Sequence, residues 1–107
     1  MKYCFENVQS SESTTVNFSE VLPKGTEPSE YAFVFDVTAR CVSGSSVVRS
    51  DKKFTISKSR NIEVNSYTDN GVEISETPGD EGVIINISHE FEEPAAIEVV
   101  VKSRFLR

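Results

Sequence analysis

The chain is dominated by β-branched aliphatic residues, and this feature constrains its fold more than any other. Val occurs 14 times and Ile 7 times, against 2 Leu and 4 Ala. β-branched side chains lose rotamer freedom in a helix but pack well on a pleated sheet, so a helical domain would show the opposite ratio. The 22 Ser and Thr residues, which compete for backbone hydrogen bonds inside helices, favour the same conclusion. We therefore expect an all-β fold with little or no helix.

Alternation of apolar and polar residues predicts the positions of the strands. The clearest strand covers 31–42, where the odd-numbered residues are apolar and are expected to face the core. After a turn at 43–46, a second alternating stretch covers 47–59, with a bulge or bend expected near Asp51. Weaker strands are expected at 2–8 and 14–22, and stronger ones at 83–91 and from about Ala96 to Phe105.

The Asn70-Gly71 pair predicts a tight β-hairpin. Such pairs adopt the positive φ angles that two-residue hairpin turns need. The flanking segments would then pair directly, with Ile62 and Val64 facing Val72 and Ile74. A second turn, rich in Gly and Pro, is expected at 77–82.

Seven or eight short strands in about 100 residues, without crossover helices, indicate the architecture. We expect one domain over residues 1–107, an antiparallel β-sandwich of immunoglobulin-like or jelly-roll-like type, or a small barrel.

No apolar run approaches the roughly 20 residues that span a bilayer, and Glu6 interrupts the region where a secretory signal would be apolar. We expect no membrane contact and a location in the cytoplasm or, after assembly, in a virion.

Charge is segregated along the chain, whose formal net charge is −6. Residues 61–98 contain ten Asp and Glu and no Lys or Arg, whereas residues 49–60 contain five Lys and Arg against Asp51 alone. Blocks of one sign usually mark a solvated face, but they also suit electrostatic complementarity between subunits or with a basic partner. Nucleic acid is a poor partner, because the chain is acidic and Phe54 is the one stacking aromatic in the basic stretch.

Several strands carry apolar residues on the face expected to point outward, among them Val34, Ile84 and Val100. Another part of the chain can cover such residues, or they can meet another subunit. We consider both arrangements open at this stage.

No catalytic or metal-binding signature stands out. His89 shares the core parity of its strand, so we expect a structural, hydrogen-bonded histidine. Its neighbours Ser88 and Glu90 would point to the opposite face, which excludes a Ser-His-acid relay among these three. Glu90 and Glu92 are expected to share a strand face, and a weak cation site formed by them with Asp80 and Glu81 has no motif behind it. We expect no enzymatic activity, metal, cofactor or small-molecule substrate.

Cys4 and Cys41 are expected to be reduced and mostly buried, with Cys41 on the core parity of its strand. A disulfide between them would require the first strand to lie beside the strand at 31–42.

No stretch matches a family signature, so the function has to be inferred from the predicted fold and its surface. The leading hypothesis is a non-enzymatic structural protein that packs with itself or onto a larger particle, such as a capsid or tail decoration protein of a virus or phage. The alternative is an acidic monomeric adaptor or inhibitor that binds a basic protein.

The predicted interface joins a basic strip to an acidic block, with apolar anchors between them. The strip is Arg49, Lys52, Lys53, Lys58 and Arg60; the block is Glu73, Glu76, Glu90, Glu92 and Glu93; and the anchors are Val34, Ile84 and Val100.

Overall fold

The protein is all-β, as the sequence predicts. The computed structural model describes residues 1–19, 32–57, 61–78 and 82–106, and these contain eight β-strands and no helix. It follows that no helix in the described part is long and apolar enough to cross a membrane. The strands are β1 (Lys2–Val8), β2 (Thr14–Ser19), β3 (Ala32–Ser43), β4 (Ser46–Ser57), β5 (Ile62–Thr68), β6 (Val72–Pro78), β7 (Gly82–His89) and β8 (Ala95–Leu106).

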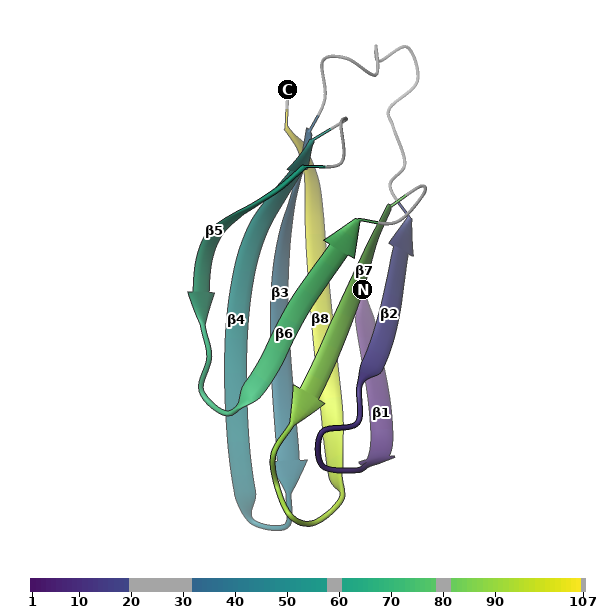
Figure 1. Ribbon diagram of the computed structural model, residues 1–107, viewed down its shortest axis with the longest axis vertical. Helices are drawn as coiled ribbons and strands as arrows, with labels where there is room; N and C mark the ends of the chain where they lie inside the picture. Colours follow the sequence, from purple (N-terminus) through teal and green to yellow (C-terminus); the bar gives the residue numbers. More distant parts are fainter. Residues whose placement is uncertain (20–31, 58–60, 79–81, 107) are drawn as a thin grey trace.

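The strands form two antiparallel sheets packed face to face (Figure 1). One sheet has five strands in the order β1-β8-β3-β4-β5, and the other has three in the order β2-β7-β6. The three longest strands, β3, β4 and β8, have 12 residues each and are adjacent in the larger sheet. Because the sheets remain separate, the protein is a β-sandwich and not the small barrel that the sequence also allowed.

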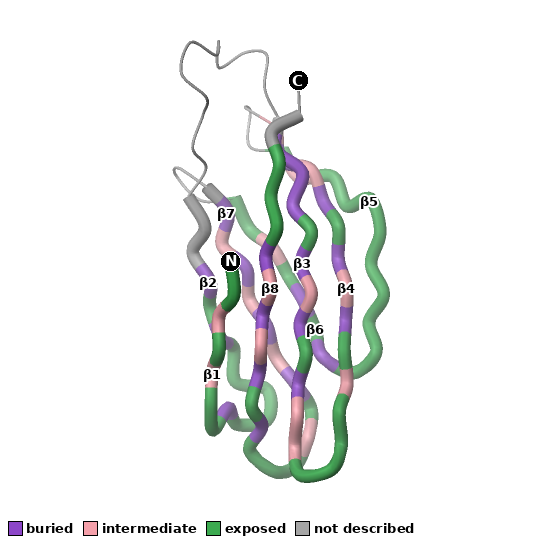
Figure 2. Tube along the Cα trace, turned by 180° about the vertical axis from the view of Figure 1, so that it is seen from behind, coloured by how far each residue is buried: buried purple, intermediate pink, exposed green. Residues whose placement is uncertain are grey.

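The core lies between the sheets and is filled by alternate residues of their strands. In β3, the predicted inward positions Phe35, Val37 and Cys41 are 0% exposed. Buried residues alternate with intermediate or exposed ones along the central strands β3, β4 and β8 in Figure 2, as expected when one face of a sheet meets the core and the other meets water. β7 follows the same rule, since Val83, Ile85, Ile87 and His89 are all buried.

The predicted hairpin over 62–74 is wrong, although a turn does occur there. β5 pairs with β4 and β6 pairs with β7, so the Asn70-Gly71 connection crosses from one sheet to the other. Gly71 has a φ of 118°, and the Asp69 carboxylate accepts its N–H at 3.0 Å. A Cβ at Gly71 would lie 3.0 Å from a methyl group of Val48, so glycine suits both the conformation and the packing. The turn signal is local, whereas the choice of pairing partner depends on contacts distant in sequence.

The predicted irregularity near Asp51 lies elsewhere. The pairing of β3 with β4 is continuous from Ala32 to Ser43, so β4 has no bulge on that side. The shift occurs in the pairing with β5, where Lys53 faces Ser66 and Phe54 faces Val64. The extra residue, Asn65, therefore belongs to β5, and β4 keeps one alternation along its length.

Candidate functional site

The unbroken alternation of β4 divides the predicted basic strip. Arg49 and Lys53 are exposed, whereas Lys52 is 8% exposed and points between the sheets with Phe54 and Ile56. Neighbouring residues of a strand point to opposite faces, so Lys52 and Lys53 cannot belong to one surface. The assignment of Lys52 to the interface is therefore wrong. Lys58 and Arg60 lie outside the described residues.

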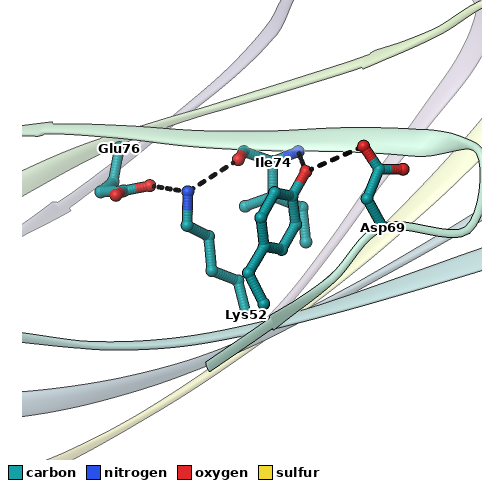
Figure 3. Close-up of polar contacts among 5 residues, drawn as sticks. Lys52, Asp69, Ile74 and Glu76 are labelled. Carbon is teal, nitrogen blue, oxygen red and sulfur yellow. Dashed lines mark hydrogen bonds and ion pairs between the residues drawn. The ribbon is translucent and has the colours of Figure 1, made fainter. Parts of the chain in front are cut away.

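Lys52 instead joins the two sheets through a polar cluster (Figure 3). Its Nζ lies 2.5 Å from Oε2 of Glu76 and donates to the Ile74 carbonyl at 3.0 Å. It also lies 4.4 Å from the centre of the Tyr67 ring, within the range of a cation–π contact. The Lys52 and Glu76 side chains are each 9% exposed, so Glu76, another predicted interface residue, is also occupied inside the protein.

The same cluster covers part of a sheet edge. β6 is an edge strand, and Tyr67 and Lys52 bind the N–H and C=O of its residue Ile74. The Tyr67 hydroxyl accepts the Ile74 N–H at 2.9 Å and donates to Asp69 at 3.4 Å. Burial, the larger effect, and the nearby Asp69 carboxylate raise the pKa of the Tyr67 hydroxyl. Occupied backbone groups cannot pair with an added strand, so β6 is protected at this point.

The outer face of the five-stranded sheet gathers most of the described positive charge. Lys102 lies opposite Asp36, which lies opposite Lys53, so these three form a row across β8, β3 and β4. In another row Arg40 lies opposite Arg49. Of the seven described Lys and Arg residues, six lie on this face: Lys2, Arg40, Arg49, Lys53, Lys102 and Arg104. Five described carboxylates share it: Glu6, Asp36, Asp51, Glu63 and Glu98.

Two shallow hollows on this face both include Lys102. The first, of about 200 Å³, is lined by Val34, Asp36, Lys53, Lys102, Ser103 and Arg104. The second, of about 280 Å³, is lined by Thr38, Arg40, Arg49, Glu98, Val100 and Lys102. We call Lys53, Lys102 and Arg104 the basic corner. None of these three forms an ion pair with a described carboxylate, whereas Lys2 pairs with Glu98 and Arg49 with Asp51.

Away from that face, the described surface is acidic. Seven carboxylates lie in this region, six of them exposed, and the buried Lys52, which pairs with Glu76, is the one Lys or Arg among its described residues. Glu73 is exposed on β6, and Glu90, Glu92 and Glu93 are exposed in the connection between β7 and β8. The expectation that Glu90 and Glu92 share a strand face is wrong, because β7 ends at His89. The seven carboxylates are Glu12, Asp69, Glu73, Glu76, Glu90, Glu92 and Glu93.

The predicted apolar anchors are largely covered within the chain. Val34 is 6% exposed, although it lies on the outer face between Thr55 and Arg104 of the adjacent strands. Too little of its surface is accessible for it to anchor a partner, so that assignment is wrong. Ile84 and Val100 are half-buried.

His89 has a structural role, as predicted from its parity. It is 1% exposed, and its Nε2 lies 2.7 Å from the Val8 carbonyl. Its Nδ1 accepts the Phe91 N–H at 3.0 Å, so Nε2 must carry the proton that it donates to Val8. Both ring nitrogens are occupied by the backbone. Among the described residues, no three His, Cys, Asp or Glu side chains gather in a way that could hold a metal ion; Asp80 and Glu81 lie outside them.

The two cysteines occupy different environments. Cys41 is buried, and burial raises the pKa of its thiol. Cys4 is exposed, contrary to expectation, because it lies opposite Glu98 on the outer face of β1. Both thiols are free, and β8 lies between their strands, so the neighbouring arrangement that a disulfide would need does not occur.

Sequence reasoning missed Arg40, Lys102 and Arg104 as members of one charged face with Arg49 and Lys53. They are distant in the sequence, and only the pairing of β3 with both β4 and β8 brings them together. Their shared outward parity is readable from the alternation, but the identity of the neighbouring strands is not.

Comparisons with known proteins add a likeness of fold. No family model matches the chain, and no curated protein matches it. The chain is similar in structure to part of the tailspike protein of Acinetobacter phage vB_ApiP_P1, with a TM-score of 0.50 and 9% sequence identity. The match covers 97% of this chain but 22% of the tailspike chain. At this identity the likeness concerns the fold alone.

Proposed function

We propose that this chain is a non-enzymatic assembly module, a small β-sandwich that packs with copies of itself or onto a larger particle such as a phage tail or capsid. The observation that carries the proposal is the spatial separation of charge. Six of the seven described Lys and Arg lie on the outer face of the five-stranded sheet, where Lys53, Lys102 and Arg104 form no ion pair with a described carboxylate, and the remaining described surface is acidic. Interspersed signs are sufficient for solubility, whereas separated signs provide complementary surfaces for a partner. The tailspike segment is a precedent for this fold in a phage protein.

Within this proposal, exposed members of the predicted interface retain their roles. Arg49 and Lys53 face outward, and Glu73, Glu92 and Glu93 are exposed on the acidic side, as is Glu90. Ile84 and Val100 would add apolar contact at the margins of the charged surfaces.

The test is the absolute mass in solution, measured by light scattering after size exclusion at two ionic strengths. The Debye length is about 30 Å at about 0.01 M salt and about 3 Å at 1 M, so a charge-driven assembly forms at the lower salt and dissociates at the higher one. Reversal of two exposed cations, Arg49→Glu with Lys53→Glu, should return the low-salt mass to that of one chain. A single-chain mass at both ionic strengths rejects packing with itself and leaves docking onto a preformed particle.

A second candidate is an adaptor whose acidic surface binds a basic protein. It is favoured by the absence of any exposed cation among the described residues of that surface. Replacement of Glu90, Glu92 and Glu93 by Gln should then weaken binding to a polylysine probe while leaving thermal unfolding unchanged. Equal binding by the wild-type chain and this variant argues against the adaptor.

A further inference from the structure

Four carboxylates gather at the end of the sandwich where β7 ends and β8 begins. The Ser11 N–H donates to the His89 carbonyl at 2.8 Å, and its hydroxyl lies 3.1 and 3.2 Å from the carboxylate oxygens of Glu90. These contacts join the connection at 9–13 to the connection at 90–94, and both lie at the lower end of the molecule in Figure 1. Neither connection contains Lys or Arg. We call Glu12, Glu90, Glu92 and Glu93 the acidic end.

The basic corner lies far from the acidic end along the same sheet. β8 begins at Ala95, directly after the acidic connection, and Lys102 is seven residues further along it. At about 3.3 Å per residue this is a distance of about 23 Å. Lys53 shares a row with Lys102 through Asp36, and Arg104 lies still further from Ala95. The acidic end and the basic corner are therefore separated along the long axis of a molecule 48 Å long.

This separation prevents the two groups from neutralising each other within one copy. An ion pair needs its nitrogen and oxygen atoms within about 4 Å of each other, far less than the distance of about 23 Å between the two groups. A two-fold contact of either group with itself would bring like charges together, which is repulsive. A contact between the acidic end of one copy and the basic corner of another brings opposite charges together.

We propose that copies of this chain associate head to tail, the acidic end of each seated on the basic corner of the next. The inference rests on the proposed function and specifies its partner as a second copy of this chain. In a head-to-tail pair one group of each sign remains unused, so the contact is heterologous and continues into a ring or a filament, whereas an antiparallel two-fold pair would use every group and stop at a dimer. The low-salt mass should therefore exceed that of a dimer as the protein concentration rises.

Complementary charge reversals test the arrangement directly. Reversal of three carboxylates, Glu12→Lys, Glu92→Lys and Glu93→Lys, leaves Glu90 in place and makes both groups of a copy basic. Lys53→Glu with Lys102→Glu makes both groups acidic. Either variant alone should stay monomeric at about 0.01 M salt, where screening is weak. An equimolar mixture should regain the mass of the wild-type assembly, because each junction then joins opposite signs.

Matched controls separate the position of a charge from the net charge. Glu6→Lys with Glu63→Lys and Glu73→Lys matches the change in net charge of the basic variant, and Lys2→Glu with Arg40→Glu matches that of the acidic variant. All of these positions lie outside both groups. Each control alone should keep the wild-type mass at low salt, and circular dichroism should show that every variant is folded.

Two results would overturn the head-to-tail arrangement. If the wild-type chain assembles but the mixed variants stay monomeric, packing with itself stands and this arrangement fails. If the wild-type chain and the mixture are both monomeric at about 0.01 M salt, intrinsic self-association fails as well, and only docking onto a particle remains of the proposed function.

Discussion

Removal of the Lys52 ammonium should destabilise the fold strongly, although β4 stays intact. Lys52→Met keeps an unbranched apolar stem but leaves the Glu76 carboxylate, 9% exposed, without its ion pair. It also removes the donor to the Ile74 carbonyl and the cation above Tyr67. Breaking a buried pair by removing one partner costs about 3–5 kcal/mol. Because the cluster lies at a sheet edge, we expect the lower limit, about 3 kcal/mol.

The size of this effect is measurable in a domain of 107 residues. A loss of about 3 kcal/mol lowers the Tm by about 12–24 °C, since each kcal/mol corresponds to about 4–8 °C at this size. Urea unfolding at pH 7, followed by far-ultraviolet circular dichroism, gives the free energy of unfolding directly. The matched control is Lys53→Met, which changes the same residue type one position further along the strand but on the exposed face; it should stay within about 0.5 kcal/mol of wild type.

A double-mutant cycle tests the cause of the loss. Lys52→Met with Glu76→Leu removes both charges, and replacement of a whole buried pair by apolar residues is often close to neutral. We expect the double variant to lie within about 1 kcal/mol of wild type, well above Lys52→Met alone. The reasoning is refuted if Lys52→Met costs no more than Lys53→Met, or if removing Glu76 as well restores nothing.

Three further predictions concern other parts of the fold. Tyr67 has a pKa raised above its ordinary value of 10.0, so its contribution to stability is fully present below about pH 10 and is lost as the pH rises through the folded-state pKa; urea midpoints against pH should show this loss in the wild-type chain and a smaller one in Tyr67→Phe. Cys4 should react with a chromogenic disulfide reagent in the native protein, whereas Cys41 should react only at the rate of unfolding; equal fast rates would contradict its burial. Gly71→Ala should cost about 1–3 kcal/mol by urea unfolding, because its φ of 118° strains a residue with a Cβ, which would meet Val48 at 3.0 Å; an unchanged midpoint would contradict this.

Local pattern was sufficient to predict the strands and their faces. The alternation in 31–42 placed Phe35, Val37 and Cys41 in the core, and the alternation in 83–91 placed His89 there with them. These predictions succeed because the direction of a side chain in a strand follows from its parity, whichever strand lies beside it. Parity also places Lys52 and Lys53 on opposite faces of their strand. The predicted basic strip grouped them nevertheless, because it was defined by the charge of the residues and not by their direction.

Pairing between strands was decided only by the tertiary structure. In the Asn70-Gly71 turn Gly71 has the expected positive φ but Asn70 does not, and the turn links two sheets and not two paired strands. Strand pairing also decided which charges lie together. Lys102 and Lys53 both lie opposite Asp36 of the strand between them, although 49 positions separate the two lysines in the sequence.

One physical reason explains which features the sequence determined and which only the tertiary structure decided. Turn conformation and side-chain direction depend on a few neighbouring residues, so the sequence determined the all-β class, the strands and the inward faces by itself. The choice of sheet, the cluster around Lys52 and the separation of the basic corner from the acidic end depend on hydrogen bonds between strands distant along the chain. Many edges can accept a given strand, and burial of the whole core selects among them.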